Sequence, residues 1–173
     1  MVRSYAGTVM IEGTTLSEGR GTTRPLELLG APQFGARPVL QWVEDFAPHW
    51  LVGCAPRVCW FEPTFHKHVG ELCEGIQLHV DAGDYRHAQF RPWRLIAAIL
   101  KAQRALRPER VLWREFPYEY EHSRLAFDVI NGGPRLRQWI EDPGADAADL
   151  DDMAAPEEQA WQEAREGALL YPG

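Results

Sequence analysis

The sequence predicts a single α+β domain over residues 1–173, in which helices pack on a mixed β-sheet. Three observations support this expectation: a strand-like alternation at residues 74–80, a helical apolar stripe at residues 92–106, and a length that suits one hydrophobic core. No internal repeat interrupts the pattern, so one layered domain is expected.

The clearest strand is EGIQLHV, in which Ile76, Leu78 and Val80 alternate with Gln77 and His79. Successive side chains of a strand point to opposite faces. We therefore expect the three aliphatic side chains to enter the core. Gln77 and His79 should project together from the other face, where both can reach one ligand.

Three further strands are expected. SYAGTVMI, residues 4–11, is rich in β formers and runs into a glycine-bearing loop at residues 12–25. VCWFEPTF, residues 58–65, and VLWREF, residues 111–116, have the same character, although Pro63 weakens the end of the former. The segments at 4–11 and 74–80 are expected to share the sheet.

The helices are marked mainly by proline and by apolar spacing. RPWRLIAAILKAQRALRP places Pro92 at a first helical position, and Pro108 ends the helix. A short helix is expected at PVLQWVEDF, and another at PRLRQWIED after the Asn-Gly-Gly turn. A last helix is expected to begin at Pro156, after an acidic loop at residues 141–155.

Charge and composition narrow the class of partner. A net charge of −7 argues against nucleic acid and against an anionic membrane surface, because both require clustered cations. Lys67 and Lys101 are the only lysines, and arginine, whose planar fork suits carboxylates, supplies the other cations. An anionic group in the ligand is therefore expected. No apolar run reaches the length of a membrane span and no secretory h-region is present, so cytoplasm is the literal expectation and the localisation stays open.

Several chemistries lack their motifs. Ser4, Ser17 and Ser123 lie in neither GxSxG nor SxxK, and no GxxxxGK[ST] phosphate loop occurs. The acidic loop lacks the spacing and the glycine of an EF-hand, so calcium is not expected. Because the count of cysteines is odd, at Cys54, Cys59 and Cys73, no complete disulfide framework can be inferred, and their disulfide state stays open.

A zinc site can be imagined from His66, His68, Cys73 and His79. Their spacing matches neither HExxH nor a paired CxxC pattern. We therefore expect no metal and no other cofactor.

The loop IEGTTLSEGRGTTRP has the character of a site. Glu12 follows an apolar run, which suits a general acid or an anchoring acceptor, and it can equally well tie loop amides together. Arg20 lies between Gly19 and Gly21, so its guanidinium can approach a ligand closely and grip a carboxylate with two hydrogen bonds. A structural pair with a neighbouring glutamate is the alternative for Arg20.

Four blocks carry a resemblance to a known family: EGTTLSEGRGTTRPLELLGAP, FEPTFHKHVGELCEGIQLHV, FRPWRLIAAIL and the ending REGALLYPG. Together they resemble the C-terminal domain of the NamZ-like exo-β-N-acetylmuramidase family, and the first two blocks as a pair are specific. The resemblance implies recognition of terminal N-acetylmuramic acid in peptidoglycan fragments. It also implies that a Rossmann-like N-terminal half supplies the catalytic glutamate, so the catalytic residue is unknown in this chain.

The resemblance implies a substrate-binding set made of Glu12, Gly13, Thr14, Arg20, Gly21, Gln77 and His79. In this set Arg20 would receive the lactyl carboxylate of the sugar. The implied partners are a Rossmann-like N-terminal half or a second copy of the chain. A non-catalytic module for muropeptides or other acidic sugars, and a truncated product without separate activity, are the alternatives.

Three positions depart from the pattern of the family. Thr15 replaces an asparagine, Gln33 stands where a tryptophan is expected, and Glu74 replaces a glycine before the strand. We expect the loss of the tryptophan to remove a sugar-stacking ring. We expect the Glu74 side chain to intrude where backbone would otherwise lie close to a ligand.

Overall fold

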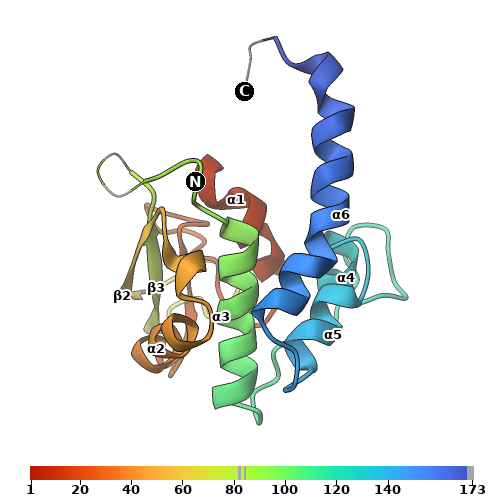
Figure 1. The fold of residues 1–173 in the computed structure, drawn as a ribbon. Coiled ribbons are helices and arrows are strands. Elements are labelled where there is room, and N and C mark those ends of the chain that lie inside the picture. The colour runs from red at the N-terminus through yellow and green to blue at the C-terminus, as the bar shows by residue number, and fades with distance from the viewer. Residues whose placement is uncertain (82, 84, 171–173) are drawn as a thin grey trace.

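The long helix α3, Pro92–Leu106, runs through the middle of the molecule, between a three-stranded sheet and the helices of the C-terminal third (Figure 1). The computed structural model describes residues 1–81, 83 and 85–170. The strands are β1, Leu28–Ala31, β2, Ala55–Phe61, and β3, Cys73–His79, in the order β1-β3-β2. Both pairs are antiparallel, so the α+β class is confirmed while the described sheet is not mixed.

The central strand β3 confirms the alternation seen in the sequence. Ile76 and Leu78 are 0% exposed and join the main core, which also holds most of the side chains of α3. Leu28, Phe61 and Cys73 form a small cluster of their own. The register pairs Leu28 with Gln77 and Phe61 with Cys73, so this cluster lies on the face of the sheet opposite to Ile76. The helix predicted at 92–106 is confirmed as α3.

The strand predicted at residues 4–11 is wrong. This segment forms helix α1, Val2–Thr8, followed by the 3₁₀ helix η1, Val9–Gly13. Its buried residues Ser4, Gly7, Thr8 and Ile11 recur at helical spacing. A Cβ on Gly7 would lie 2.2 Å from the carbonyl oxygen of Pro92, so α1 packs closely on the start of α3. This tertiary contact overrides the local β propensity.

Helix α2, Ala36–Phe46, confirms the short helix expected there, and η2, Pro48–Leu51, follows it. The side chain of Glu74 accepts hydrogen bonds from the backbone N–H of Gly35 at 3.0 Å and of Ala36 at 2.9 Å. Glu74 therefore turns toward the N-terminus of α2, where a carboxylate is stabilised by the helix dipole. Gln33 has φ 56 and lies exposed next to this turn.

The segment VLWREF forms no strand, contrary to prediction. Trp113 makes an isolated antiparallel bridge with Thr14, flanked by a hydrogen bond from Thr15 N to Leu112 O and one from Arg114 N to Gly13 O. The partner segment leaves η1 only at Thr14 and turns away soon after, so the pairing stays short. The extended piece nevertheless fixes residues 112–114 against the end of η1.

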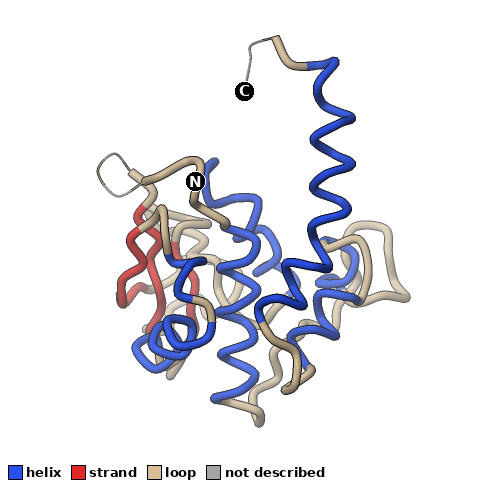
Figure 2. The backbone as a smooth tube through the Cα atoms, in the orientation of Figure 1, coloured by secondary structure: helices blue, strands red, loops and turns tan. Residues whose placement is uncertain are grey.

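The C-terminal helices are α4, Ala126–Ile130, α5, Arg135–Glu141, and α6, Ala147–Arg165, with η3, Glu166–Ala168, at the end. The expected helix near 134–142 is confirmed. The acidic loop is wrong for residues 147–155, because Asp146 and Asp149 form a capping box and start α6 there. Pro156 consequently lies inside α6, whose distal part extends away from the body (Figure 2). In the described part of the chain, no helix has both the length and the hydropathy to cross a bilayer.

Candidate functional site

A cavity of about 260 Å³ opens where three segments meet: the end of η1 with its following loop, the loop after β2, and residues 112–118. Its lining combines charged side chains with aromatic rings, contributed by Glu12, Arg20, Phe65, His66, Arg114, Phe116 and Tyr118. A polar cavity walled by aromatic rings suits a ligand with both polar and apolar faces, such as a sugar.

Glycine shapes the loop that carries Arg20. Gly21 has φ +80, and a Cβ at this position would lie 1.8 Å from the hydroxyl oxygen of Thr64. Thr64 N donates to the carbonyl of Arg20 at 3.2 Å, and its hydroxyl donates to Gly21 O at 3.3 Å. The absence of a side chain at Gly21 therefore lets the two loops join. In the second loop His66 and His68 also have positive φ, 71 and 58, which is uncommon outside glycine.

Arg20 is held by two carboxylates. Its Nη2 donates to Oε1 of Glu12, and its Nε donates to Oε1 of Glu18. The side chain of Glu18 is 1% exposed, whereas those of Glu12 and Arg20 are partly open to solvent. Arg20 thus joins a buried carboxylate to a carboxylate on the cavity wall.

Lys67, a buried residue of the loop after β2, completes this network. Its Nζ lies 2.7 Å from Oε2 of Glu18 and donates to the carbonyls of Ile11 at 2.9 Å and Thr14 at 3.1 Å. The Lys67 side chain is 8% exposed, so the pair with Glu18 is removed from water. Two cations, Arg20 and Lys67, therefore balance two carboxylates, Glu12 and Glu18.

Burial and charge act in opposite directions on the pKa values of this network. Burial raises the pKa of Glu18, but Lys67 and Arg20 outweigh it and leave the pKa below its ordinary value. For Lys67 burial dominates over the pull of Glu18 and lowers the pKa to about 8. Burial lowers the pKa of Arg20, and its two carboxylate partners raise it overall. At neutral pH, Glu18, Lys67 and Arg20 are therefore charged.

The third wall belongs to residues 112–118. Tyr118 donates its hydroxyl to Oε2 of Glu12 at 3.3 Å, and its pKa is raised by burial and by Glu12. The guanidinium carbon of Arg114 lies 3.8 Å from the ring centre of Phe116. Glu12 therefore accepts from Arg20 and from Tyr118, which makes it an organising acceptor of the cavity wall.

The structure divides the site residues predicted from the sequence into three groups. Glu12 and Arg20 line the cavity. Gly13 and Thr14 lie beneath it: a Cβ on Gly13 would meet the backbone of Phe127 at 2.5 Å, and the buried Thr14 hydroxyl donates to Ile11 O at 2.8 Å. Gly21 belongs to the same second group, because it lets the loop of Arg20 join the loop of Thr64.

Gln77 and His79 belong to the third group, because neither lines the cavity. Gln77 Oε1 accepts from Arg57 Nη2 at 2.8 Å across the β2–β3 pair. His79 lies on the same face of β3, and its Nε2 is buried without a hydrogen-bond partner among the described residues. Their role as sugar ligands stays a prediction.

The residues considered for zinc do not converge. His68 contacts Thr15 O at 2.9 Å, whereas Cys73 is buried in the small cluster on the sheet. Over residues 1–81, 83 and 85–170, no group of three or more His, Cys, Asp or Glu side chains is arranged to hold a metal ion. Cys54, Cys59 and Cys73 are all free thiols.

Sequence reasoning missed Arg114, Phe116, Tyr118 and Lys67. The run REFPYEY contained a signal for the first three, because a strand-like segment there ends in alternating charged and aromatic residues. Lys67 carried a weaker signal, as one of two lysines in a chain that otherwise uses arginine. Neither signal indicates which segment lies across the cavity.

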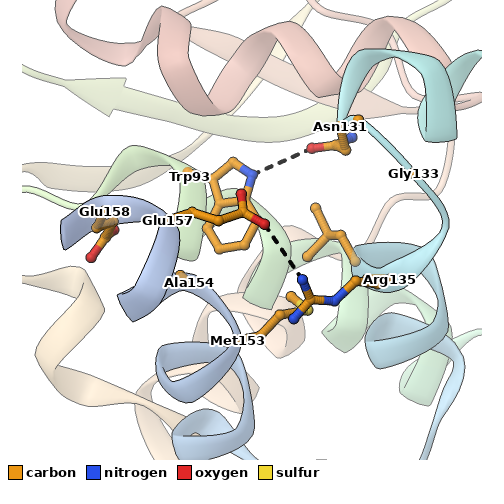
Figure 3. A pocket seen from close by; sticks show the side chains of 10 residues that line it. Trp93, Asn131, Gly133, Arg135, Met153, Ala154, Glu157 and Glu158 are labelled. Carbon is orange, nitrogen blue, oxygen red and sulfur yellow. Dashed lines mark hydrogen bonds and ion pairs between the residues drawn. The ribbon is translucent and has the colours of Figure 1, made fainter. Parts of the chain in front are cut away.

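A second cavity, of about 300 Å³, lies between the start of α3, the α4–α5 turn and α6 (Figure 3). The indole N–H of Trp93 donates to Asn131 at its floor, at 3.3 Å. Its charged side chains are all paired: Arg135 lies 3.4 Å from Glu157, and Glu158 accepts from Arg94, which does not line the cavity. This cavity consequently offers no uncompensated charge, and the first cavity is the better candidate.

Comparison with known proteins relates the whole chain to one family. Residues 3–171 match the family model described as "Exo-beta-N-acetylmuramidase NamZ, C-terminal". The chain is 32% identical over 167 residues to the "Peptidoglycan beta-N-acetylmuramidase NamZ" of Bacillus subtilis (strain 168). This match covers 96% of the chain but 36% of the relative, so the chain spans little more than a third of that protein.

Two solved structures share the fold, both DUF1343 family proteins from Bacteroides fragilis NCTC 9343. One superposes with a TM-score of 0.75 at 16% identity and the other with 0.61 at 20% identity. Each match covers 98% of the chain, and 42% or 40% of the solved chain. The family match over nearly the whole sequence and the structural match over the same span agree. The chain belongs to the family of C-terminal domains of NamZ-type exo-β-N-acetylmuramidases.

Proposed function

We propose that this domain binds the terminal N-acetylmuramic acid of peptidoglycan fragments in the cavity formed around Glu12 and Arg20. The supporting observation is the composition of that cavity, where aromatic rings from Phe65, Phe116 and Tyr118 surround charged groups in about 260 Å³. Aromatic faces pack on the apolar faces of a sugar ring, while charged and hydroxyl groups bind its polar substituents. The Bacillus relative is a peptidoglycan β-N-acetylmuramidase by name, which supports a peptidoglycan sugar as the ligand.

We further propose that the domain is the substrate-binding half of a hydrolase and that the proton donor comes from elsewhere. Glycoside hydrolysis uses two carboxyl groups that flank the scissile bond. Among the residues lining the cavity, Glu12 is the one carboxylate, and it is already held by Arg20 and Tyr118. Glu18 is nearby, but it is buried and paired with Lys67. It therefore cannot deliver a proton to a substrate bound in the cavity.

Binding is tested by calorimetric titration of the full chain with N-acetylmuramic acid and with N-acetylglucosamine. We expect the acidic sugar to bind more tightly, and Phe116→Ala to weaken both sugars through loss of the aromatic wall. Arg135→Gln, in the second cavity, is the control and should leave both affinities unchanged. Equal affinity for the two sugars would contradict the proposed substrate.

Catalysis is tested separately with a chromogenic N-acetylmuramide. We expect no turnover by this chain alone, and turnover after addition of a Rossmann-like N-terminal half. Phe65, which lines the cavity and is 55% exposed, is an apolar side chain that such a half, or a second copy of the chain, would cover. Sugar binding without turnover in either mixture would favour the non-catalytic binding module.

A further inference from the structure

The charges around the cavity are balanced except at one residue. Arg20 donates to both Glu12 and Glu18, and Glu18 is also paired with Lys67. Two carboxylates offset the positive charge of the guanidinium they share, so it attracts an anionic ligand only weakly. The sequence had favoured Arg20 as the partner of an anionic ligand, and the geometry gives it an internal role instead.

Arg114 is the remaining cation on the cavity wall. Throughout the described part of the chain, no carboxylate oxygen lies within 4.0 Å of its guanidinium nitrogens. Its Nη1 is buried and has no hydrogen-bond partner among the described residues. A buried donor of this kind is rare in proteins and marks a group that waits for a ligand or a water.

The position of Arg114 is fixed without a ligand. Its backbone N–H donates to Gly13 O at 3.1 Å, and the adjacent Trp113 bridges to Thr14. Its guanidinium lies over the ring of Phe116, at 3.8 Å. A contact with a ring does not use the N–H donors of a guanidinium, which can bind a carboxylate with two hydrogen bonds.

We infer that Arg114 is the anion-binding residue of the cavity, and that it receives the carboxylate of an acidic sugar while Arg20 only positions the wall. This inference rests on the proposed function and specifies which group of the sugar is recognised. The lactyl group of N-acetylmuramic acid carries such a carboxylate, and N-acetylglucosamine lacks it. A free, unesterified acid is therefore the form that Arg114 selects.

The test compares N-acetylmuramic acid with its methyl ester, which keeps the sugar and removes the charge. We expect the wild type to prefer the acid by about 10-fold or more, as for a hydrogen bond to a charged group. Arg114→Gln should abolish this preference with little effect on the ester. Arg114→Lys should retain part of it, and Arg135→Gln, the same change in the second cavity, should retain all of it.

Folding and binding are separated by a second measurement. Thermal melting checks that each variant is folded. Anion binding is measured separately, by following the NMR signal of the Arg114 Nε–H group while lactate, the acid fragment of the sugar, is added. We expect lactate to shift the Arg114 signal and to leave that of Arg135 unchanged.

The outcomes separate the two proposals. If no sugar binds while lactate shifts Arg114, the proposed function fails and the anion site stands. If sugars bind but the acid and the ester bind equally, or if Arg114→Gln keeps the preference for the acid, the assignment to Arg114 is overturned and sugar binding stands.

Discussion

Lys67 Nζ lies 2.7 Å from Oε2 of Glu18, and both side chains are almost entirely buried beneath the candidate cavity. The same ammonium binds the carbonyls of Ile11 and Thr14 at the end of η1. One lysine therefore joins the loop after β2 to the loop that carries Arg20, and the geometry of the cavity depends on this pair.

Replacing Lys67 by methionine should destabilise the fold strongly. The change leaves the buried carboxylate of Glu18 without its ammonium partner, and removing one member of a buried pair typically costs about 3–5 kcal/mol. Urea denaturation at pH 7 measures the loss. Lys101→Met is the matched control, because Lys101 is also buried but binds the carbonyls of Trp139 and Asp142. A loss no larger than in Lys101→Met would contradict the role of the pair.

The ammonium of Lys67 should titrate near pH 8, because burial lowers its pKa to about that value. Carbon-13 labelling of lysine yields two side-chain signals, from Lys67 and Lys101, and the signal lost in Lys101→Arg identifies the other. The folded pKa lies below the ordinary 10.5, so the unfolded chain binds the proton more tightly. Lys67 should therefore make the unfolding free energy rise between pH 8 and 10.5. A midpoint near 10.5 would refute the burial argument.

Gly21→Ala should destabilise the protein more than Gly132→Ala. Both glycines have φ near +75, at +80 and +74, so the backbone strain of an alanine is similar, about 1–2 kcal/mol. Only at Gly21 does the new Cβ collide, 1.8 Å from the Thr64 hydroxyl, whereas nothing lies within 4 Å at Gly132. The difference between the two melting temperatures isolates the collision. Equal shifts would show that the two loops separate at no cost.

Arg20→Lys should affect the wall of the cavity and not its selectivity. A lysine cannot donate to Glu12 and Glu18 in the geometry of the guanidinium, so we expect a modest loss of stability, about 1–2 kcal/mol, because Arg20 is partly exposed. N-acetylmuramic acid and its methyl ester should both bind more weakly by the same factor. A selective loss of the acid would return the anion-binding role to Arg20.

Glu74→Gln should weaken the start of α2. The carboxylate accepts from Gly35 N and Ala36 N, and a charged acceptor at a helix N-terminus is worth about 0.5–2 kcal/mol. Chemical denaturation measures the loss, and Glu71→Gln, in the exposed loop nearby, is the control. A loss no larger than in Glu71→Gln would contradict this role of Glu74.

Local patterns predicted the elements whose burial follows a simple period. The alternation of Ile76 and Leu78 with Gln77 and His79 matches β3, and the apolar stripe from Pro92 to Leu106 matches α3, because both elements are packed on the core along their length. Two residues of the polar, glycine-rich segment 12–25 line the candidate cavity, so the composition of the segment and the structure point to the same loop, whose role in binding stays a prediction.

Local patterns failed where small residues or distant partners decide. Helix α1 is buried through Ser4, Gly7 and Thr8, which a hydrophobicity pattern does not count as core. The start of α6 depends on the capping box between Asp146 and Asp149, which an acidic composition hides.

The sequence by itself determined the class of the fold, its central strand and helix, and a charged loop with Glu12 and Arg20. Only the tertiary structure decided that both acids of this loop neutralise Arg20 and that Arg114 lies across the same cavity with a donor unsatisfied. The physical reason is that the charge available to a ligand is a sum over neighbours in space. Glu12 and Glu18 come from the loop of Arg20 itself, whereas Arg114 and Tyr118 reach the same cavity from a distant segment of the chain.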